Sequence, residues 1–180
     1  MMVINQFASG VMSYYKFEEE HFMCNIFPET IVFGNNVNKI REQRGLRIKQ
    51  ITEIVGYDRG CWSKMEKGEQ DIELSTVVKI AKTLDVYLPL LFSRDFSCLD
   101  DESIRGYVEE DYLMIFASNV KRTLEKLNKK QVYIYAVTGM DESNINKILK
   151  EKNNNPQIST LVQIANGLQQ DMASMFRRNG

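Results

Sequence analysis

The sequence predicts an all-α protein built from two tandem copies of one small helical domain, preceded by an N-terminal extension. Two observations carry this prediction: the chain resembles itself when it is shifted by somewhat less than half its length, and apolar residues recur at helical spacing within each copy. Strand-like alternation occurs only in short pieces of residues 1–33. The expected segments are the extension at 1–32, a first domain at 33–92, an acidic linker at 93–115 and a second, divergent domain at 116–180.

The chain of 180 residues has the composition of an ordinary soluble protein, with 43% hydrophobic and 26% charged residues. It contains no apolar run near the roughly 20 residues of a membrane span and no signal-peptide pattern, so we expect a cytoplasmic protein. Cys24, Cys61 and Cys98 lie far apart, which predicts neither a disulfide framework nor a zinc site. His21 is the only histidine, and we therefore expect no enzyme and no cofactor.

The net charge of −1 argues at first against a nucleic-acid partner, because phosphate binding normally requires excess Lys and Arg. The charge is unevenly distributed, however. Residues 33–92 carry +2 and residues 116–180 carry +5, whereas the connector at 93–115 carries −5. Two basic segments are therefore separated by an acidic linker, which we expect to be solvated or, alternatively, to mimic DNA and cover a basic face.

The internal repeat sets the register of the helices. At a shift of 83, the matched residues are Asn36-Val37 with Asn119-Val120, Gly56 with Gly139, Trp62 with Ile145, Lys64 with Lys147, and Met65 with Ile148. At a shift of 84, they are Ser75-Thr76 with Ser159-Thr160, Ile80-Ala81 with Ile164-Ala165, Leu84 with Leu168, and Phe92 with Phe176. The added residue falls in the polar stretch 152–155, where a loop tolerates an insertion.

Several short helices are predicted in the first copy. Their expected ranges are 36–44, 48–55, 59–66, 75–84 and 87–92. Between the second and the third, Gly56 permits the positive φ of a helix C-terminus and Asp58 can cap the next helix. A short turn of this kind defines a helix-turn-helix unit, and Gly139-Met140-Asp141 repeats it in the second copy.

Three motifs follow one another in the first copy. They are Val37-x-x-Ile40-Arg41-x-x-Arg44, Trp62-Ser63-Lys64-Met65-Glu66-Lys67-Gly68, and Val77-x-x-Ile80-Ala81-x-x-Leu84-x-Val86. With these motifs the chain resembles the lambda-repressor/Cro-like, XRE-type family of DNA-binding domains, and the second copy resembles it more distantly. The resemblance implies an ion pair between Arg41 and Glu66. The second copy has Leu124 and Leu149 at these positions, a joint change that leaves no buried charge without a partner.

The resemblance further implies that the third helix lies in the major groove and that the second helix crosses the phosphate backbone. The implied third-helix contacts are Arg59, Gly60, Cys61, Ser63 and Lys64, whereas Trp62 points inward. Arg59 suits bidentate reading of guanine, and Lys64 suits guanine or a phosphate. The implied phosphate contacts are Arg47, Lys49 and Gln50, around Ile48, where the family commonly has glutamine.

The second copy keeps Gln131 at the position of that family glutamine. Its implied third-helix contacts are Ser143, Asn144, Asn146 and Lys147, of which the asparagines suit adenine. Asp141 and Glu142 open this helix with acid, which favours capping but repels DNA phosphates. We therefore expect the second copy to be either the partner of the first in a pseudo-dimer on DNA or a module for oligomerisation.

The resemblance thus predicts a sequence-specific transcriptional regulator, a repressor, that binds double-stranded DNA and is encoded by a prokaryote or a phage. A homodimer or a protein partner bound through the second domain is a further expectation. The alternative is a protein-interaction module, such as an antitoxin or a phage-encoded host-defence inhibitor, that uses the same fold.

Overall fold

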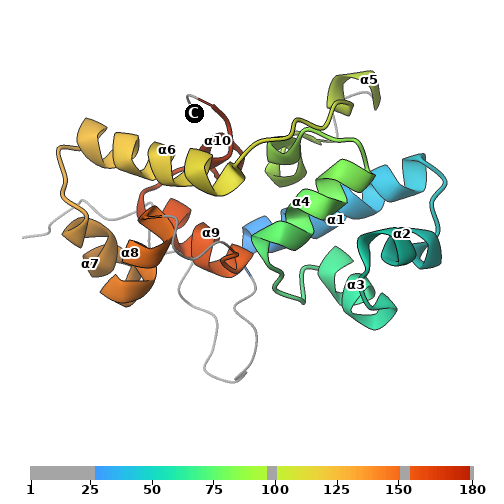
Figure 1. Ribbon diagram of the computed structural model, residues 1–180, viewed down its shortest axis with the longest axis horizontal. Coiled ribbons are helices and arrows are strands. Elements are labelled where there is room, and N and C mark those ends of the chain that lie inside the picture. Colours follow the sequence, from blue (N-terminus) through green and yellow to red (C-terminus); the bar gives the residue numbers. More distant parts are fainter. Residues whose placement is uncertain (1–26, 97–100, 151–154, 179–180) are drawn as a thin grey trace, which may run out of the picture.

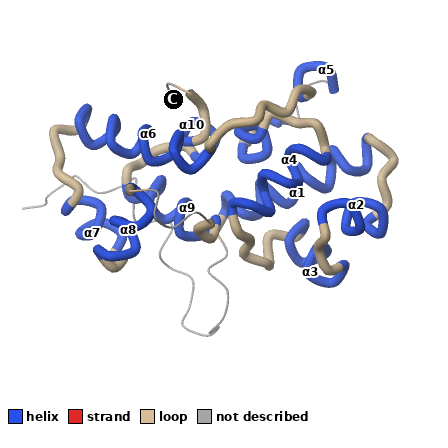
Figure 2. Tube along the Cα trace, viewed as in Figure 1, coloured by secondary structure: helices blue, strands red, loops and turns tan. Residues whose placement is uncertain are grey.

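The computed structural model describes residues 27–96, 101–150 and 155–178 (Figure 1). Regular structure in these ranges is helical apart from two isolated β-bridges, as predicted (Figure 2). The elements are α1 (Pro28–Gln43), α2 (Ile48–Val55), α3 (Arg59–Glu66), α4 (Leu74–Thr83), the 3-10 helix η1 (Leu88–Phe92), α5 (Asp101–Ile104), α6 (Tyr112–Lys126), α7 (Val132–Thr138), α8 (Glu142–Leu149), α9 (Ile158–Gly167) and α10 (Met172–Met175). No helix in the described ranges is long and apolar enough to cross a membrane.

The first half of the protein, residues 28–96, contains its helices close to where the sequence predicts them. α2 and α3 have the predicted bounds, and α4 and η1 differ from them by a single residue. The exception is α1, which begins at Pro28 rather than near residue 36, so residues 28–32 belong to a helix instead of the N-terminal extension. Proline suits the first turn of a helix because its missing N–H has no intrahelical partner there. The remaining residues of the expected extension, 1–26, lie outside the described ranges.

α2, a short turn and α3 form the predicted helix-turn-helix unit. α2 ends at Gly56, which has a φ of 73° and donates its N–H to the carbonyl of Thr52. α3 begins after Asp58, whose carboxylate accepts a hydrogen bond of 2.9 Å from the N–H of Cys61. A left-handed conformation favours glycine, and an exposed helix start favours aspartate, so both residues have the roles expected from the sequence.

The second half, residues 112–178, follows the same order of helices. α6 begins at Tyr112, a few residues before the predicted boundary at 116, and Asp111 caps it by accepting the N–H of Met114 at 2.9 Å. α7 ends at Gly139 with a φ of 67°. Asp141 then caps α8. The predicted glycine-turn-aspartate sequence is therefore present between α7 and α8.

Asn36 of α1 and Asn119 of α6 occupy matched positions and make matched hydrogen bonds. Each is buried, and each donates its side-chain amide to backbone carbonyls near the end of its own half. The accepting carbonyls are those of Leu91 (3.0 Å) and Ser93 (2.9 Å) for Asn36, and those of Met175 (3.0 Å), Arg177 (2.8 Å) and, more distantly, Ser174 (3.5 Å) for Asn119. The two halves thus close their helical bundles with the same polar contact.

The described part of the acidic linker is attached to the body of the protein. Glu109 lies 3.0 Å from Lys82 of α4, and Glu110 lies 2.5 Å from Arg178 near the end of the second half. Neither cation belongs to α3. These two glutamates therefore do not cover the expected DNA-binding face, while Asp100 lies outside the described residues.

The two halves pack directly against each other. Glu73 and Gln157 form an isolated antiparallel bridge, and the rings of Phe92 and Phe176 lie 5.5 Å apart between their centroids. The two backbone hydrogen bonds of the bridge run from Leu74 N–H to the Pro156 carbonyl (3.0 Å) and from Ile158 N–H to the Ile72 carbonyl (2.8 Å). In this arrangement α3 and α8 lie toward opposite ends of one long edge of the molecule (Figure 1).

Candidate nucleic-acid interface

α3 has one buried and one outward face. Trp62 and Met65 are 0% and 1% exposed and pack in the core, so the inward placement predicted for Trp62 is confirmed. The predicted contact residues lie outside this core: Arg59, Gly60 and Lys64 are exposed, and Cys61 and Ser63 are half-buried. The outward face therefore presents two cations and a hydroxyl group, which are donors for base edges and phosphate oxygens.

A buried polar network holds α3 against α1. Nε of Arg41 lies 2.6 Å from Oε1 of Glu66, and Nε1 of Trp62 donates to the same oxygen at 2.7 Å. Both charged side chains are only 9% exposed, which gives a charge-assisted pair in a site of low dielectric. The predicted ion pair is confirmed, and it holds α3 against α1. In the second half, Leu124 and Leu149 are buried at the matched positions.

The start of α3 combines a carboxylate cap with an available arginine. The hydrogen bond from the N–H of Cys61 is the main reason that the pKa of Asp58 lies below its usual value of 3.8. Arg59 lies 3.8 Å from Glu53, and both of these side chains are about 60% exposed. An ion pair this exposed contributes little, so Arg59 can exchange Glu53 for a DNA acceptor at small cost.

The start of α2 carries the predicted phosphate contacts. Arg47, Lys49 and Gln50 are all exposed, and Ile48 is half-buried. The side-chain oxygen of Gln50 accepts the N–H of Arg47 at 2.8 Å, so its amide group is left to donate. Two cations and an N–H donor at one helix start form a suitable contact for a phosphate.

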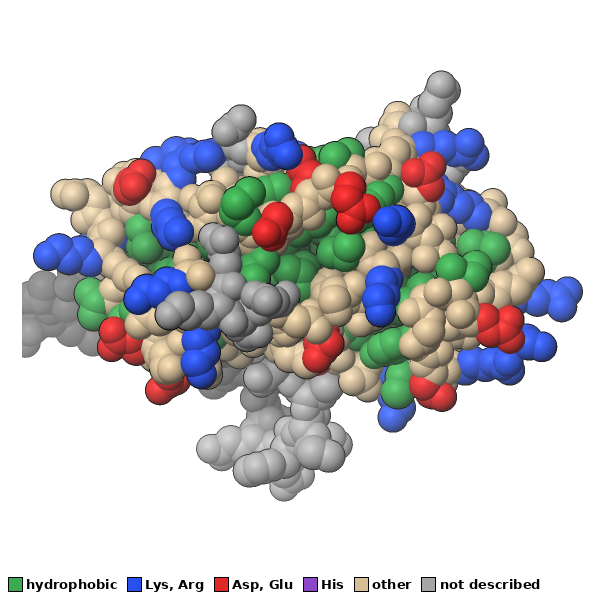
Figure 3. Space-filling view, in the orientation of Figure 1, with side chains coloured by type: hydrophobic (Ala, Val, Ile, Leu, Met, Phe, Trp, Pro, Cys, Tyr) green, Lys and Arg blue, Asp and Glu red, His purple; other side chains and the backbone are tan. Residues whose placement is uncertain are grey.

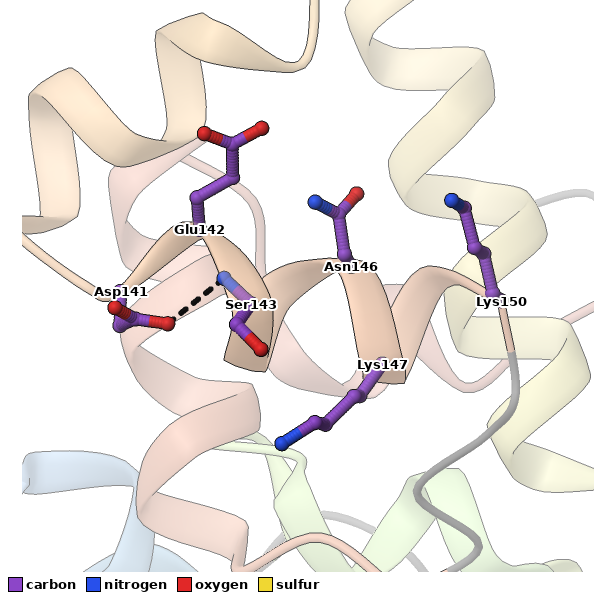
Figure 4. Close-up of a pocket in the computed structure, with 6 residues that line it drawn as sticks. All are labelled: Asp141, Glu142, Ser143, Asn146, Lys147 and Lys150. Carbon is purple, nitrogen blue, oxygen red and sulfur yellow. Dashed lines mark hydrogen bonds between the residues drawn. The ribbon is translucent and has the colours of Figure 1, made fainter.

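α8 presents a polar face of different chemistry (Figure 4). Glu142, Asn146 and Lys150 point to one side of the helix, and Ser143 and Lys147 point to another. Together with Asp141, these residues line an open hollow. The predicted contacts Ser143, Asn144 and Lys147 are exposed, and Asn146 is half-buried. All four therefore lie outside the core, as expected from the repeat.

One hydrogen bond at α8 is not predicted by the sequence. Gln131 donates to the side-chain oxygen of Asn146 at 2.7 Å and thereby links the residue before α7 to α8. Tyr135 lies in the same cluster: burial raises its pKa, the nearby Glu142 adds to the rise, and hydrogen bonds with Gln131 and Asn146 oppose it. Residues this far apart have no periodic spacing that would predict their contact. Gln131 occupies the side-chain oxygen of Asn146 and Tyr135 one N–H of its amide group, so the second N–H is the donor left for a ligand.

Basic side chains gather toward both ends of the molecule. In the view of Figure 3, Lys and Arg lie over the α2–α3 region at one end and over the α6–α8 region at the other, and acidic side chains are interspersed. Such a distribution suits a partner that carries negative charge along an extended surface.

Comparison with known proteins agrees with this geometry. Residues 37–91, from α1 to η1, match the helix-turn-helix family. Over 63 residues the chain is 32% identical to the control protein C.SmaI of Serratia marcescens, an alignment that covers 35% of this chain and 75% of that protein. The chain belongs to the helix-turn-helix family. The first half is thus a helix-turn-helix domain that binds double-stranded DNA, and the protein is a DNA-binding regulator of transcription.

Proposed function

We propose that the protein recognises a specific operator by placing α3 in the major groove, and that it acts as a repressor without enzymatic activity. The observation that carries the proposal is the outward face of α3, where Arg59 and Lys64 are exposed opposite the buried Trp62. The buried Arg41–Glu66 pair supports this face rigidly, as base reading requires.

Each residue has a distinct role in this proposal. Arg59 donates two hydrogen bonds to the O6 and N7 atoms of a guanine, while Lys64 contacts a second guanine or a phosphate. Arg47, Lys49 and Gln50 position the domain by contacting the phosphate backbone, which carries no sequence information. In this proposal the operator overlaps a promoter, so that the bound protein blocks access by polymerase.

We also propose that the second half is a divergent helix-turn-helix domain that acts as the pseudo-dimer partner of the first. It has the same order of helices, a left-handed glycine after α7 as after α2, and an aspartate cap on α8 as on α3. Asn119 repeats the hydrogen bonds of Asn36. In this proposal Asn144, Asn146 and Lys147 face DNA, and Gln131 supports Asn146.

Binding of the full chain to duplex DNA across a salt series tests the proposed function. A random duplex should be bound with an affinity that falls steeply as salt rises, and a site selected from a random library should be bound much more tightly. A preparation that shows no salt-dependent affinity for DNA but co-purifies with a stoichiometric protein would instead favour the protein-interaction module.

Variants of α3 then test the assignment of individual residues. Arg59→Ala should weaken binding to the selected site by about 10- to 100-fold and relax the preference for guanine at one position. Lys64→Ala should weaken binding as well, with a reduced salt dependence if it contacts a phosphate. The control is Lys79→Ala, which removes an exposed lysine from α4, outside α2, α3 and the α6–α8 region. Equal affinities for all three variants would show that α3 does not read the operator.

A further inference from the structure

The bridge between the two halves joins residues that match each other in the repeat. Glu73 pairs with Gln157, and the repeat aligns these two positions in the same register as Ser75 with Ser159. The hydrogen bonds around them are reciprocal in the same way. Ser75 N–H donates to the side-chain oxygen of Asn155 at 2.9 Å, and the matched Ser159 N–H donates to Asp71 at 3.0 Å.

The aromatic contacts repeat this symmetry at a second place. The rings of Phe92 and Phe176, matched in the same register, lie 5.5 Å apart. Each then contacts the matched phenylalanine of its own half: Phe92 lies 5.1 Å from Phe33, and Phe176 lies 5.7 Å from Phe116. Four rings therefore follow one another in the order Phe33, Phe92, Phe176, Phe116, which reads the same from either half.

Matched residues that contact each other define a local two-fold axis between the halves. Such a contact is the isologous interface of a symmetric dimer. Here both surfaces belong to one chain and are buried against each other within it. The arrangement places α3 and α8 toward opposite ends of one edge (Figure 1). In helix-turn-helix dimers, two such helices bind half-sites one turn of DNA apart. A single copy of this chain supplies both.

The two helices differ in the residues that they present. The register that matches Gly56 with Gly139 also places Arg59 of α3 on Glu142 of α8, and Ser63 on Asn146. Figure 4 shows Glu142 and Asn146 on the same side of α8. Arginine donates to guanine, whereas glutamate accepts from the amino group of cytosine and asparagine pairs with adenine. An arginine replaced by a glutamate also reverses the charge at the position nearest the start of the helix.

We propose that one copy of this chain binds an asymmetric operator with two unlike half-sites, the first read by α3 at guanine and the second read by α8 at cytosine or adenine. The proposal rests on the proposed function and adds the stoichiometry and the asymmetry of the site. α3 supplies most of the affinity, because Arg59 attracts DNA phosphates, whereas Glu142 at the matched position of α8 repels them.

Selection of bound sequences from a random duplex library, combined with the mass of the complex in solution, tests the proposal. The expected result is one chain per duplex on a site whose two halves, about 10 base pairs apart, are not inverted repeats of each other. A palindromic consensus, or two chains per site, would overturn the proposal and leave the proposed function intact. If no site is selected and no duplex is bound, the proposed function itself has failed.

Glu142→Arg tests the role of α8 directly, because it gives α8 the residue that α3 has. The measured quantity is the ratio of the affinity for an inverted repeat of the first half-site to the affinity for the wild-type operator. We expect this ratio to be about tenfold higher for Glu142→Arg than for the wild type. Glu142→Gln should change the preferred base in the second half-site only. Glu125→Arg, which makes the same charge change on an exposed residue of α6, should leave this ratio unchanged. A ratio that shifts equally for Glu125→Arg, or that does not shift for Glu142→Arg, would exclude reading by α8.

Discussion

The phenyl rings of Phe92 and Phe176 lie with their centroids 5.5 Å apart, at matched positions of the two halves. Phe176 also contacts Tyr112 and Phe116 within its own half, at centroid distances of 6.2 and 5.7 Å. Both phenylalanines are buried. The core of each half is therefore completed by a ring from the other half, which couples the stabilities of the two.

Phe176→Ala is expected to lower the free energy of unfolding by about 3–5 kcal/mol, as deletion of a buried phenyl group usually does. Because the ring contacts Phe92, the first half should lose stability as well. Trp62 is the single tryptophan and lies in that half, so its fluorescence transition should move to lower denaturant together with the loss of helix. Met114→Ala, at a side chain that is 47% exposed, is the control and should have little effect. If the denaturant midpoint of the Trp62 fluorescence transition is the same in Phe176→Ala as in the wild type, the two halves unfold independently.

The buried pair of Arg41 and Glu66 predicts a non-additive mutant cycle. Either Arg41→Leu or Glu66→Leu leaves one charge without its partner in a site that is 9% exposed, and each should cost about 3–5 kcal/mol of stability. The double variant recreates the apolar pair Leu124 and Leu149 of the second half. It should therefore cost less than the sum of the two single variants by about 1–3 kcal/mol.

Urea denaturation of the wild type and the three variants measures this difference. The double variant should remain less stable than the wild type, because the Nε1 group of Trp62 and the carbonyl of Leu46 lose their hydrogen-bond partners. Strictly additive costs would show that the two charges do not stabilise each other.

Local chemistry makes much of the fold predictable. Gly56 and Asp58 mark the turn between α2 and α3 because a left-handed residue and a helix cap each favour one residue type, and both have these roles. The ion pair of Arg41 and Glu66 is predicted only through the resemblance to a family, since the two residues lie far apart along the chain and on different helices. The start of α1 at Pro28 is missed because Gly34 interrupts the helical pattern.

Contacts between the two halves cannot be predicted from spacing alone. The repeat aligns Phe92 with Phe176, but a repeat states which residues are equivalent and not which residues touch. That Glu73 meets Gln157 depends on how the two halves pack, which is a property of tertiary structure. The same holds for the hydrogen bond between Gln131 and Asn146, which changes what Asn146 can offer to a base.

The cap on α3 predicts a pH-dependent contribution to stability. The pKa of Asp58 is lower in the folded protein than its usual value of 3.8, chiefly because its carboxylate accepts the N–H of Cys61. A depressed folded-state pKa gives a contribution that is present above the unfolded pKa and is lost as pH falls through the folded pKa. Asp58→Asn keeps the capping acceptor without the titration. Melting temperatures should therefore differ less between wild type and Asp58→Asn at pH 3 than at pH 6. A difference that is constant over this range would show that the Asp58 charge does not contribute.

Gly34 of α1 lies directly against the backbone of α3, and this contact predicts a substitution effect opposite to helix propensity. In an unconstrained helix, Gly34→Ala would stabilise by roughly 1 kcal/mol. Here an added Cβ would collide with the carbonyl oxygens of Met65 and Glu66, which belong to the backbone and cannot move without displacing α3. We therefore expect a net loss of about 1–3 kcal/mol, as is typical of overpacking.

Gly60→Ala is the matched control for this prediction, because Gly60 also lies in a helix and a Cβ there would meet only the side chain of Asp58, at 3.1 Å. Gly60→Ala should leave the free energy of unfolding unchanged or raise it by up to about 1 kcal/mol, as helix propensity predicts. Gly34→Ala should in addition weaken binding to the selected operator, since displacement of α3 moves Arg59 and Lys64 away from the DNA groups that we propose they contact. If the Gly34→Ala protein is as stable as the wild type, the added Cβ does not collide with the backbone of α3, and the two helices are not packed as closely as the structure shows.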